Sequence, residues 1–387
     1  MAAIPIRRVV TGNDERGKSK VAWDGPAPSV HEGSMGFGRA HTDFWVWNDS
    51  PVPLSGANDD GNLTYDFPGP VDGGHWRVVQ GPGRSRDYDQ SKDTLYVPPH
   101  EPRREGKGPR WDRGMSSAHS GGMHKTETVD YAIMMDGQRT LVLDSGEVEW
   151  EQGDIVIDVG AWHQWLSKAD GPGRIAFDMI AARFVDGPVG LAQGNDKVMK
   201  APAGQKLPEG VKPVRRIVVT DREPWKSSVV SDGPSPDVRT DPARPGFALQ
   251  RMWVTDGTPS KIALESLHLS HVLVPPPNGS VLNVVTLPPD AAWKGKVGAK
   301  EVKAWYASVG APEASTWSES APHPYIQKTR TIDFVIVQDG EAVLVLDTQE
   351  VQVKKGDFIV VRGQNHAWAN RSSKPVVLAI ASHDGRA

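Results

Sequence analysis

The chain has 387 residues, contains no cysteine and carries a formal net charge of −4 at pH 7. This length predicts two or three domains with sizeable cores, and the lack of cysteine excludes disulfides, thiolate metal ligands and cysteine nucleophiles. The weakly negative charge gives no electrostatic footprint for nucleic acid or an anionic membrane. The first ten residues lack an apolar core of signal-peptide length, and no segment approaches the ~20 apolar residues that span a bilayer, so we expect a cytoplasmic protein.

Turn-forming residues are abundant, with 40 glycines and 32 prolines, whereas stretches with helical periodicity are few. This combination is typical of an all-β chain with many short strands. The exception is Ala299–Tyr306, which we predict to be a short helix.

A long irregular stretch at residues 81–122 follows the first expected strands. It contains several glycines and prolines and mixed charges, including Arg103, Arg104, Arg110 and Arg113. Loops of this length in a compact domain are usually functional or disordered. Two interpretations stay open: a flexible insertion, or a lid whose arginines bind a carboxylate or phenolate of a substrate.

The strongest strand signal begins at His124. Strict alternation predicts that one face of this strand carries the side chains of His124, Thr126, Thr128, Asp130, Ala132 and Met134. Four polar residues followed by apolar ones on one face are unusual for a surface strand. The pattern fits better a strand whose face lines a wet cavity inside a barrel.

Glycines divide the next part of the chain into short returning strands. Gly137 ends the first run, Gly153 forms a turn into the strand at 155–157, and Gly160 breaks the chain again. His163 and Trp165 then share a face, because they are two residues apart. Histidines from two different strands are therefore expected to face one interior.

This order of residues resembles the two signature motifs of the cupin superfamily. In that family the first motif supplies two histidines and a glutamate, and the second supplies one histidine, all to one metal ion. The resemblance implies that His124, Asp130 and His163 are metal ligands and catalytic residues. Neutral imidazoles with a carboxylate suit a divalent ion, Fe, Mn, Ni or Zn, with positions open for substrate. The alternatives are a polar pocket without a metal and, for Asp130, a structural role in binding backbone amides.

The first motif departs from the family pattern at Thr126, which stands where the second histidine is expected. His119, five residues before His124, is the candidate metal ligand that would replace it, and His75 and His100 are further candidates.

Four residues near these positions are predicted to contact substrate: Trp165, Thr126, Thr128 and Met134. The chain has 14 tryptophans, and an aromatic wall beside a metal suits a flat or apolar organic molecule. Tryptophans also commonly fill the cores of small barrels, and for Trp368 we favour that interpretation.

The motif region occurs twice. Gln327–Phe334 repeats His124–Tyr131 without a gap, and the repeat continues through Gly340, Gly356, Asp357, Gly363, His366 and Trp368. Together with the resemblance, this predicts two tandem cupin β-barrels of jelly-roll type from an internal duplication. The expected divisions are an N-terminal barrel at 1–186, a Gly/Pro/Lys-rich linker at 187–213 and a C-terminal barrel at 214–387.

The second copy has Gln327 and Thr329 where the family has histidines, so we expect it to be a structural partner with a degenerate site. His323 and His366 leave open that it keeps a site of its own.

The resemblance implies a metal-dependent enzyme that acts on a small organic molecule, an oxidoreductase of dioxygenase type. The alternatives are a decarboxylase, isomerase, hydrolase or cyclase, or a protein that binds a small molecule without turnover. The expected partners are a small-molecule substrate and, in a homodimer, a second copy of the chain.

Overall fold

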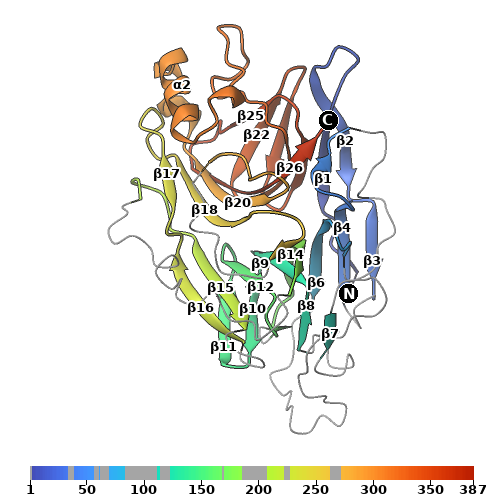
Figure 1. The fold of residues 1–387 in the computed structure, drawn as a ribbon. Coiled ribbons are helices and arrows are strands. Elements are labelled where there is room, and N and C mark those ends of the chain that lie inside the picture. Colours follow the sequence, from blue (N-terminus) through green and yellow to red (C-terminus); the bar gives the residue numbers. More distant parts are fainter. Residues whose placement is uncertain are drawn as a thin grey trace.

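The computed structural model describes residues 2–33, 39–55, 61, 69–82, 111–113, 123–167, 170–184, 207–221, 227–261 and 272–387. Their regular structure is almost entirely β, which confirms the all-β prediction (Figure 1). The predicted short helix is also confirmed, as α2 (Ala299–Ser308). Among the described helices none has the length and apolar character needed to cross a bilayer.

The first copy of the repeat forms the centre of one large sheet and one small sheet. The large sheet has the order β16 (Ser227–Pro234), β15 (Arg215–Asp221), β12 (Ile155–Val159), β9 (Thr128–Asp136), β14 (Gly173–Arg183), β6 (Gly74–Gly81), β4 (Ala40–Trp47) and β3 (Ser29–Glu32), with β19 (Ser260–Lys261) beside β14. The small sheet has the order β11 (Gly146–Glu151), β10 (Gln138–Leu143) and β13 (Gln164–Leu166).

The second copy repeats this topology strand for strand. Its large sheet has the order β2 (Ser19–Pro26), β1 (Arg7–Asn13), β24 (Phe358–Arg362), β21 (Thr331–Asp339), β26 (Val376–Arg386), β20 (Ser280–Leu287), β18 (Ala248–Thr255) and β17 (Val238–Thr240), with β5 (Val52–Pro53) beside β26. Its small sheet has the order β23 (Glu350–Lys354), β22 (Glu341–Leu346) and β25 (His366–Ala369). The matching orders support two jelly-roll units derived by duplication.

The two units exchange their first hairpins. β1 pairs in parallel with β24 of the second unit, and β15 pairs in parallel with β12 of the first. Figure 1 shows the blue β1–β2 hairpin standing beside the red C-terminal strands. Each large sheet therefore contains strands from both predicted domains, 1–186 and 214–387, and these domain bounds stay predictions. Most of the predicted linker at 187–213 lies outside the described residues.

The large sheets pack face to face through an aromatic core. It contains Trp45, Trp47 and Trp76 from the first sheet and Phe334 and Phe358 from the second, all almost fully buried. The rings of Trp47 and Phe334 stack with centroids 5.4 Å apart. Because side chains alternate across a strand, the opposite face of each large sheet points into its own barrel, where the candidate site lies.

Candidate metal centre

Sheet register brings two carboxylates and an imidazole together inside the first barrel. Asp130 on β9 lies directly opposite Asp158 on β12. After β12, Gly160 adopts a φ of +60°, a conformation that suits glycine, and the chain returns to His163. One ligand atom from each of these three buried side chains lies within 4.8 Å of the others.

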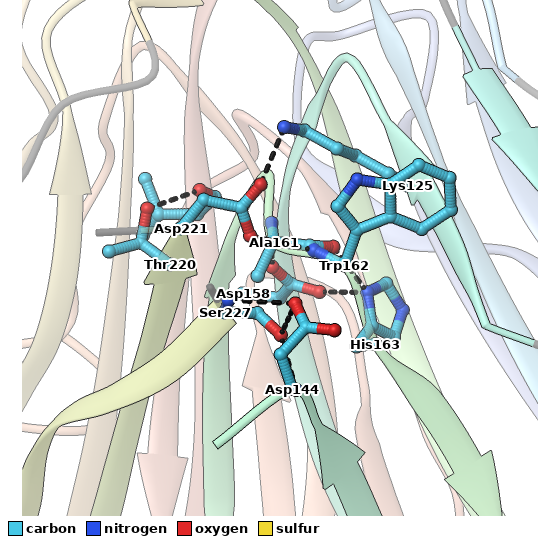
Figure 2. A network of polar contacts seen from close by, with 10 residues as sticks. Lys125, Asp144, Asp158, Ala161, Trp162, His163, Thr220, Asp221 and Ser227 are labelled. Atoms are coloured by element: carbon cyan, nitrogen blue, oxygen red, sulfur yellow. Dashed lines mark hydrogen bonds and ion pairs between the residues drawn. The ribbon is translucent and has the colours of Figure 1, made fainter. Parts of the chain in front are cut away.

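Asp158 fixes the ring of His163. Its Oδ2 lies 2.5 Å from Nδ1 of His163, and its Oδ1 accepts a hydrogen bond of 2.8 Å from the backbone N–H of Ala161. Nδ1 of His163 also lies 2.9 Å from the carbonyl oxygen of Ala161. Two acceptors at Nδ1 hold a proton there, so Nε2 is the ring nitrogen that a metal would bind. Figure 2 shows Asp158 and His163 pointing toward one another.

His124 stands beside His163. The backbones of the two residues exchange hydrogen bonds of 2.9 and 3.0 Å, and their ring centroids are 4.3 Å apart. The ring of His124 is only half-buried, and its nitrogens are not part of the three-residue group. The structure thus brings the two predicted histidines together, with Asp158 as an additional close partner of His163.

The site contains two side chains with shifted pKa values and two buried polar atoms without hydrogen-bond partners among the described residues. Burial, and next the nearby carboxylate of Asp158, raise the pKa of Asp130 to about 8. Burial lowers the pKa of His163, but the charge and hydrogen bond of Asp158 outweigh it and raise that pKa to about 9. Oδ1 of Asp130 and Nε2 of His163 are buried without a hydrogen-bond partner among the described residues. A divalent cation would satisfy both atoms and offset the repulsion between the carboxylates, so the donor set fits a metal.

The predicted substrate-contacting residues line the same interior. The hydroxyls of Thr126 and Thr128 share a hydrogen bond of 2.6 Å, and Met134 belongs to the apolar cluster of the barrel interior. Trp165 packs edge-on to His163 with ring centroids 5.0 Å apart, and also contacts Phe177. Their contact with a substrate stays a prediction.

An exchanged strand holds this site in place. Nζ of Lys125 lies 2.6 Å from Oδ2 of Asp221 on β15, and both side chains are almost fully buried. Oδ1 of Asp221 accepts the backbone N–H of Trp162 at 3.0 Å. Figure 2 shows this pair next to Trp162 and His163. A carboxylate from the second repeat therefore braces both ligand-bearing segments of the first.

Other predicted candidates lie elsewhere. His119 and His100 fall outside the described residues, as does most of the predicted lid at 81–122. The described strand β7 (Trp111–Arg113) pairs with β8 (His124–Thr126), with Arg113 opposite His124. His75 lies on β6, separated from Asp130 by one residue of β14 in the sheet register, and is not in the three-residue group.

A second group of possible metal ligands comprises His31, His41 and Asp43. The guanidinium of Arg77 already binds Asp43, with Nε 2.6 Å from Oδ1, and that positive charge opposes a cation. Burial, and next Arg77, lower the pKa of His41 to about 3. This group is better described as an arginine–aspartate ion pair with two histidines beside it.

The second barrel lacks the two-carboxylate arrangement. Val361 lies opposite Asp333, as Asp158 lies opposite Asp130. Gln327 replaces the first histidine, and its Nε2 is 3.5 Å from Nε2 of His366. His323 accepts a hydrogen bond from the backbone N–H of Tyr325 instead of turning to this position.

Asp158 is the residue that sequence reasoning missed. Its signal was present: it is an aspartate inside the apolar run of β12, where the second copy has valine. Only the pairing of β12 with β9 shows that this aspartate faces Asp130.

A family model described as "Cupin domain" matches residues 318–382. Among curated proteins, "Phomopsin biosynthesis cluster protein C'" of Diaporthe leptostromiformis is 36% identical over 66 residues, which are 16% of this chain and 35% of that protein. "Cupin-domain-containing oxidoreductase srdD" of Neurospora crassa is 31% identical over 67 residues, 16% of this chain and 34% of that protein. The matched stretch thus spans about a third of the length of these relatives.

Solved structures resemble the chain over a longer range at low identity. The putative glyoxylate induced protein of Pseudomonas aeruginosa has a TM-score of 0.41 and 11% identity, over 93% of this chain and 83% of that one. A mutant form of the salicylate 1,2-dioxygenase of Pseudoaminobacter salicylatoxidans has a TM-score of 0.36 and 11% identity, over 89% of this chain and 76% of that one.

Proposed function

We propose that the first barrel is the active site of a metal-dependent enzyme acting on a small organic molecule. The "Cupin domain" model, which matches residues 318–382 in the second repeat, supports this proposal through the equivalence of the two repeats. The observation that carries this proposal is the buried group of Asp130, Asp158 and His163, in which Oδ1 of Asp130 and Nε2 of His163 lack hydrogen-bond partners among the described residues. Such atoms cost stability unless a ligand satisfies them.

The proposed metal ligands are Nε2 of His163 and the carboxylate of Asp130. His124 and Asp158 lie next to them and are further possible ligands. This mixed nitrogen and oxygen set suits Fe(II), Mn(II), Ni(II) or Zn(II). When bound, such an ion supplies a Lewis-acidic or redox-active centre with positions open to substrate.

The chain's own residues have separate tasks in this proposal. Asp158 holds the proton on Nδ1 of His163 and so keeps Nε2 as a donor. Trp165 and Met134 give the substrate an apolar surface and exclude water, whereas the paired hydroxyls of Thr126 and Thr128 can hydrogen-bond to its polar groups.

For the reaction class we propose an oxidoreductase of dioxygenase type. The support is the name of two partial relatives, which are called cupin-domain-containing oxidoreductases. A decarboxylase, isomerase, hydrolase or cyclase would use the same ligands with a metal that takes no part in redox chemistry.

Metal analysis of the purified full chain tests the proposal, with Asp130→Asn and Asp333→Asn as a matched pair. These aspartates occupy equivalent positions, but only Asp130 has a second carboxylate opposite. We expect about one equivalent of metal per chain, lost in Asp130→Asn and kept in Asp333→Asn. A metal-free protein after reconstitution, or equal loss in both variants, would refute the proposed centre, and oxygen uptake with the reconstituted enzyme separates redox from non-redox chemistry.

A further inference from the structure

The second barrel contains a cavity of about 90 Å³. That space exceeds what one water requires several-fold, so it can hold several waters or a small organic molecule. Its walls come from β18, β20, β21, β25, β26 and α2. The cavity reaches the position that corresponds to the metal centre of the first barrel, because Gln327, Asp333 and His366 line it. We expected this barrel to be a structural partner only, and the cavity gives a reason to assign it a binding role.

The position equivalent to the metal centre is occupied by a chain of hydrogen-bonded side chains. Nδ1 of His366 lies 2.9 Å from the carbonyl oxygen of Gln364, which leaves Nε2 to face the amide of Gln327 at 3.5 Å. The hydroxyl of Tyr306 donates toward Oε1 of Gln327 at 3.2 Å. These contacts use the polar atoms that a metal would need.

Much of the cavity wall away from these polar groups is apolar and aromatic. Leu249, which lines the cavity, stands where the register of the first barrel has His41. In the core beside it, Val361 stands where the first barrel has Asp158. Helix α2 adds Trp305 and Tyr306, both buried. Trp368 packs against the core of this barrel, as we favoured, and it lines the cavity as well.

One charged group in this apolar wall keeps an unsatisfied donor. Arg244 is 6% exposed, and its Nη2 is buried without a hydrogen-bond partner among the described residues. Its Nε donates to Oδ2 of Asp241 at 2.7 Å. The guanidinium lies between two rings, with Cζ 3.6 Å from the centroid of Tyr325 and 3.7 Å from that of Phe247. The hydroxyl of Tyr325 donates to the same Asp241 oxygen at 2.6 Å, so the arginine is held rigidly at the cavity wall.

We propose that the second barrel binds a small carboxylate with a flat, apolar body, without a metal. The carboxylate accepts a hydrogen bond from Nη2 of Arg244, which is otherwise a buried donor left unsatisfied. The body of the ligand lies against Trp305 and Trp368. Oδ1 of Asp333 is a second buried atom without a partner among the described residues, and it can accept a hydrogen bond from a hydroxyl of the ligand.

Binding of benzoate to the full chain, followed by calorimetry and by tryptophan fluorescence, tests this proposal. Benzoate should bind, benzamide should bind at least about tenfold more weakly because it has no charge, and a hydroxybenzoate isomer should bind more tightly than benzoate. Arg244→Gln should weaken benzoate binding about 10- to 100-fold, the range for a hydrogen bond to a charged group.

Two further variants keep the outcome decisive. Ile380→Trp fills the cavity and leaves Arg244 in place, so it should also abolish binding; this covers the case in which Arg244→Gln fails to fold. His163→Ala and treatment with a chelator act on the first barrel and should leave benzoate binding unchanged. Loss of binding with the chelator, or unchanged binding in Ile380→Trp, would overturn the proposal. A first barrel that holds no metal would leave both expected results unchanged, so failure of the proposed function is distinguishable from failure of this proposal.

Discussion

Replacing Asp158 with asparagine removes one negative charge from the first barrel and keeps the size of the side chain. The asparagine can still accept a hydrogen bond from the backbone N–H of Ala161. It cannot offer a negatively charged oxygen to Nδ1 of His163, which in the wild type lies 2.5 Å from Oδ2 of Asp158. Changes to such supporting partners of a ligating histidine cost about 10- to 100-fold in metal affinity. We therefore expect Asp158→Asn to fold normally and to bind Mn(II) up to about 100-fold more weakly than the wild type.

The size of the effect on stability follows from linkage between binding and folding. A metal at about 1,000 times its dissociation constant stabilises the folded state by ~4.1 kcal/mol. A hundredfold loss of affinity leaves the same metal at about 10 times that constant, where the stabilisation is only ~1.4 kcal/mol. The metal-free variant should be less stable than the metal-free wild type, because Asp158→Asn removes the carboxylate that pairs with the buried His163.

Urea unfolding of both proteins, with Mn(II) and with a chelator, measures these differences directly. Asp158→Val, which introduces the residue of the second copy, should give a loss at least as large. An equal gain in unfolding free energy from Mn(II) in wild type and Asp158→Asn would show that Asp158 does not support the site. A wild type that gains nothing from any divalent ion would contradict the metal centre itself.

Three other outcomes follow from the same geometry. His163→Ala should abolish metal binding whereas His366→Ala keeps it, as measured by metal content per chain, and the reverse result would move the centre to the second barrel. The pKa of Asp130 in the folded state is raised to about 8, so the metal-free protein should lose stability as the pH rises from about 4 through 8. Asp130→Asn should flatten this pH dependence of the unfolding free energy, measured by urea unfolding. An unchanged slope in the variant would refute the role given to Asp130. Lys125→Met should destabilise the fold by about 3–5 kcal/mol, because it leaves the carboxylate of Asp221 buried without its cation. Combining Lys125→Met with Asp221→Leu should recover most of this loss of unfolding free energy. No recovery in the double variant would argue against a stabilising ion pair between the two residues.

Local sequence patterns predicted which strands carry the site residues better than they predicted which residues lie opposite one another in neighbouring strands. Alternation along β9 correctly placed Ala132 and Met134 toward the barrel interior. The spacing to His163 correctly brought a second strand to the same place, because glycines with positive φ follow β9, β11 and β12, at Gly137, Gly153 and Gly160. Asp158 could not be assigned, since its role depends on which residue of β9 lies opposite, and register is a property of two strands.

The cavity of the second barrel escaped prediction for a related reason. The comparison of motifs considered only the positions of family ligands, and at those positions the second copy looks degenerate. Arg244 lies in a loop before β18, far in sequence from Gln327 and His366, and only the folded chain brings it to the same cavity. Loss of ligands at a motif therefore does not imply loss of a site.

The exchange of hairpins makes each barrel depend on both repeats. β15 adds the outer part of the first sheet and supplies Asp221, whose carboxylate holds Lys125 and the backbone of Trp162 next to His163. β1 adds the corresponding part of the second sheet. A chain divided between the copies would leave β12 and β24 as open edges, which commonly pair with another chain, and would leave Lys125 without its buried carboxylate. The candidate metal centre is thus formed by the whole chain, even though all of its proposed metal ligands come from the first repeat, and the second barrel can diverge in its pocket without losing its structural contribution.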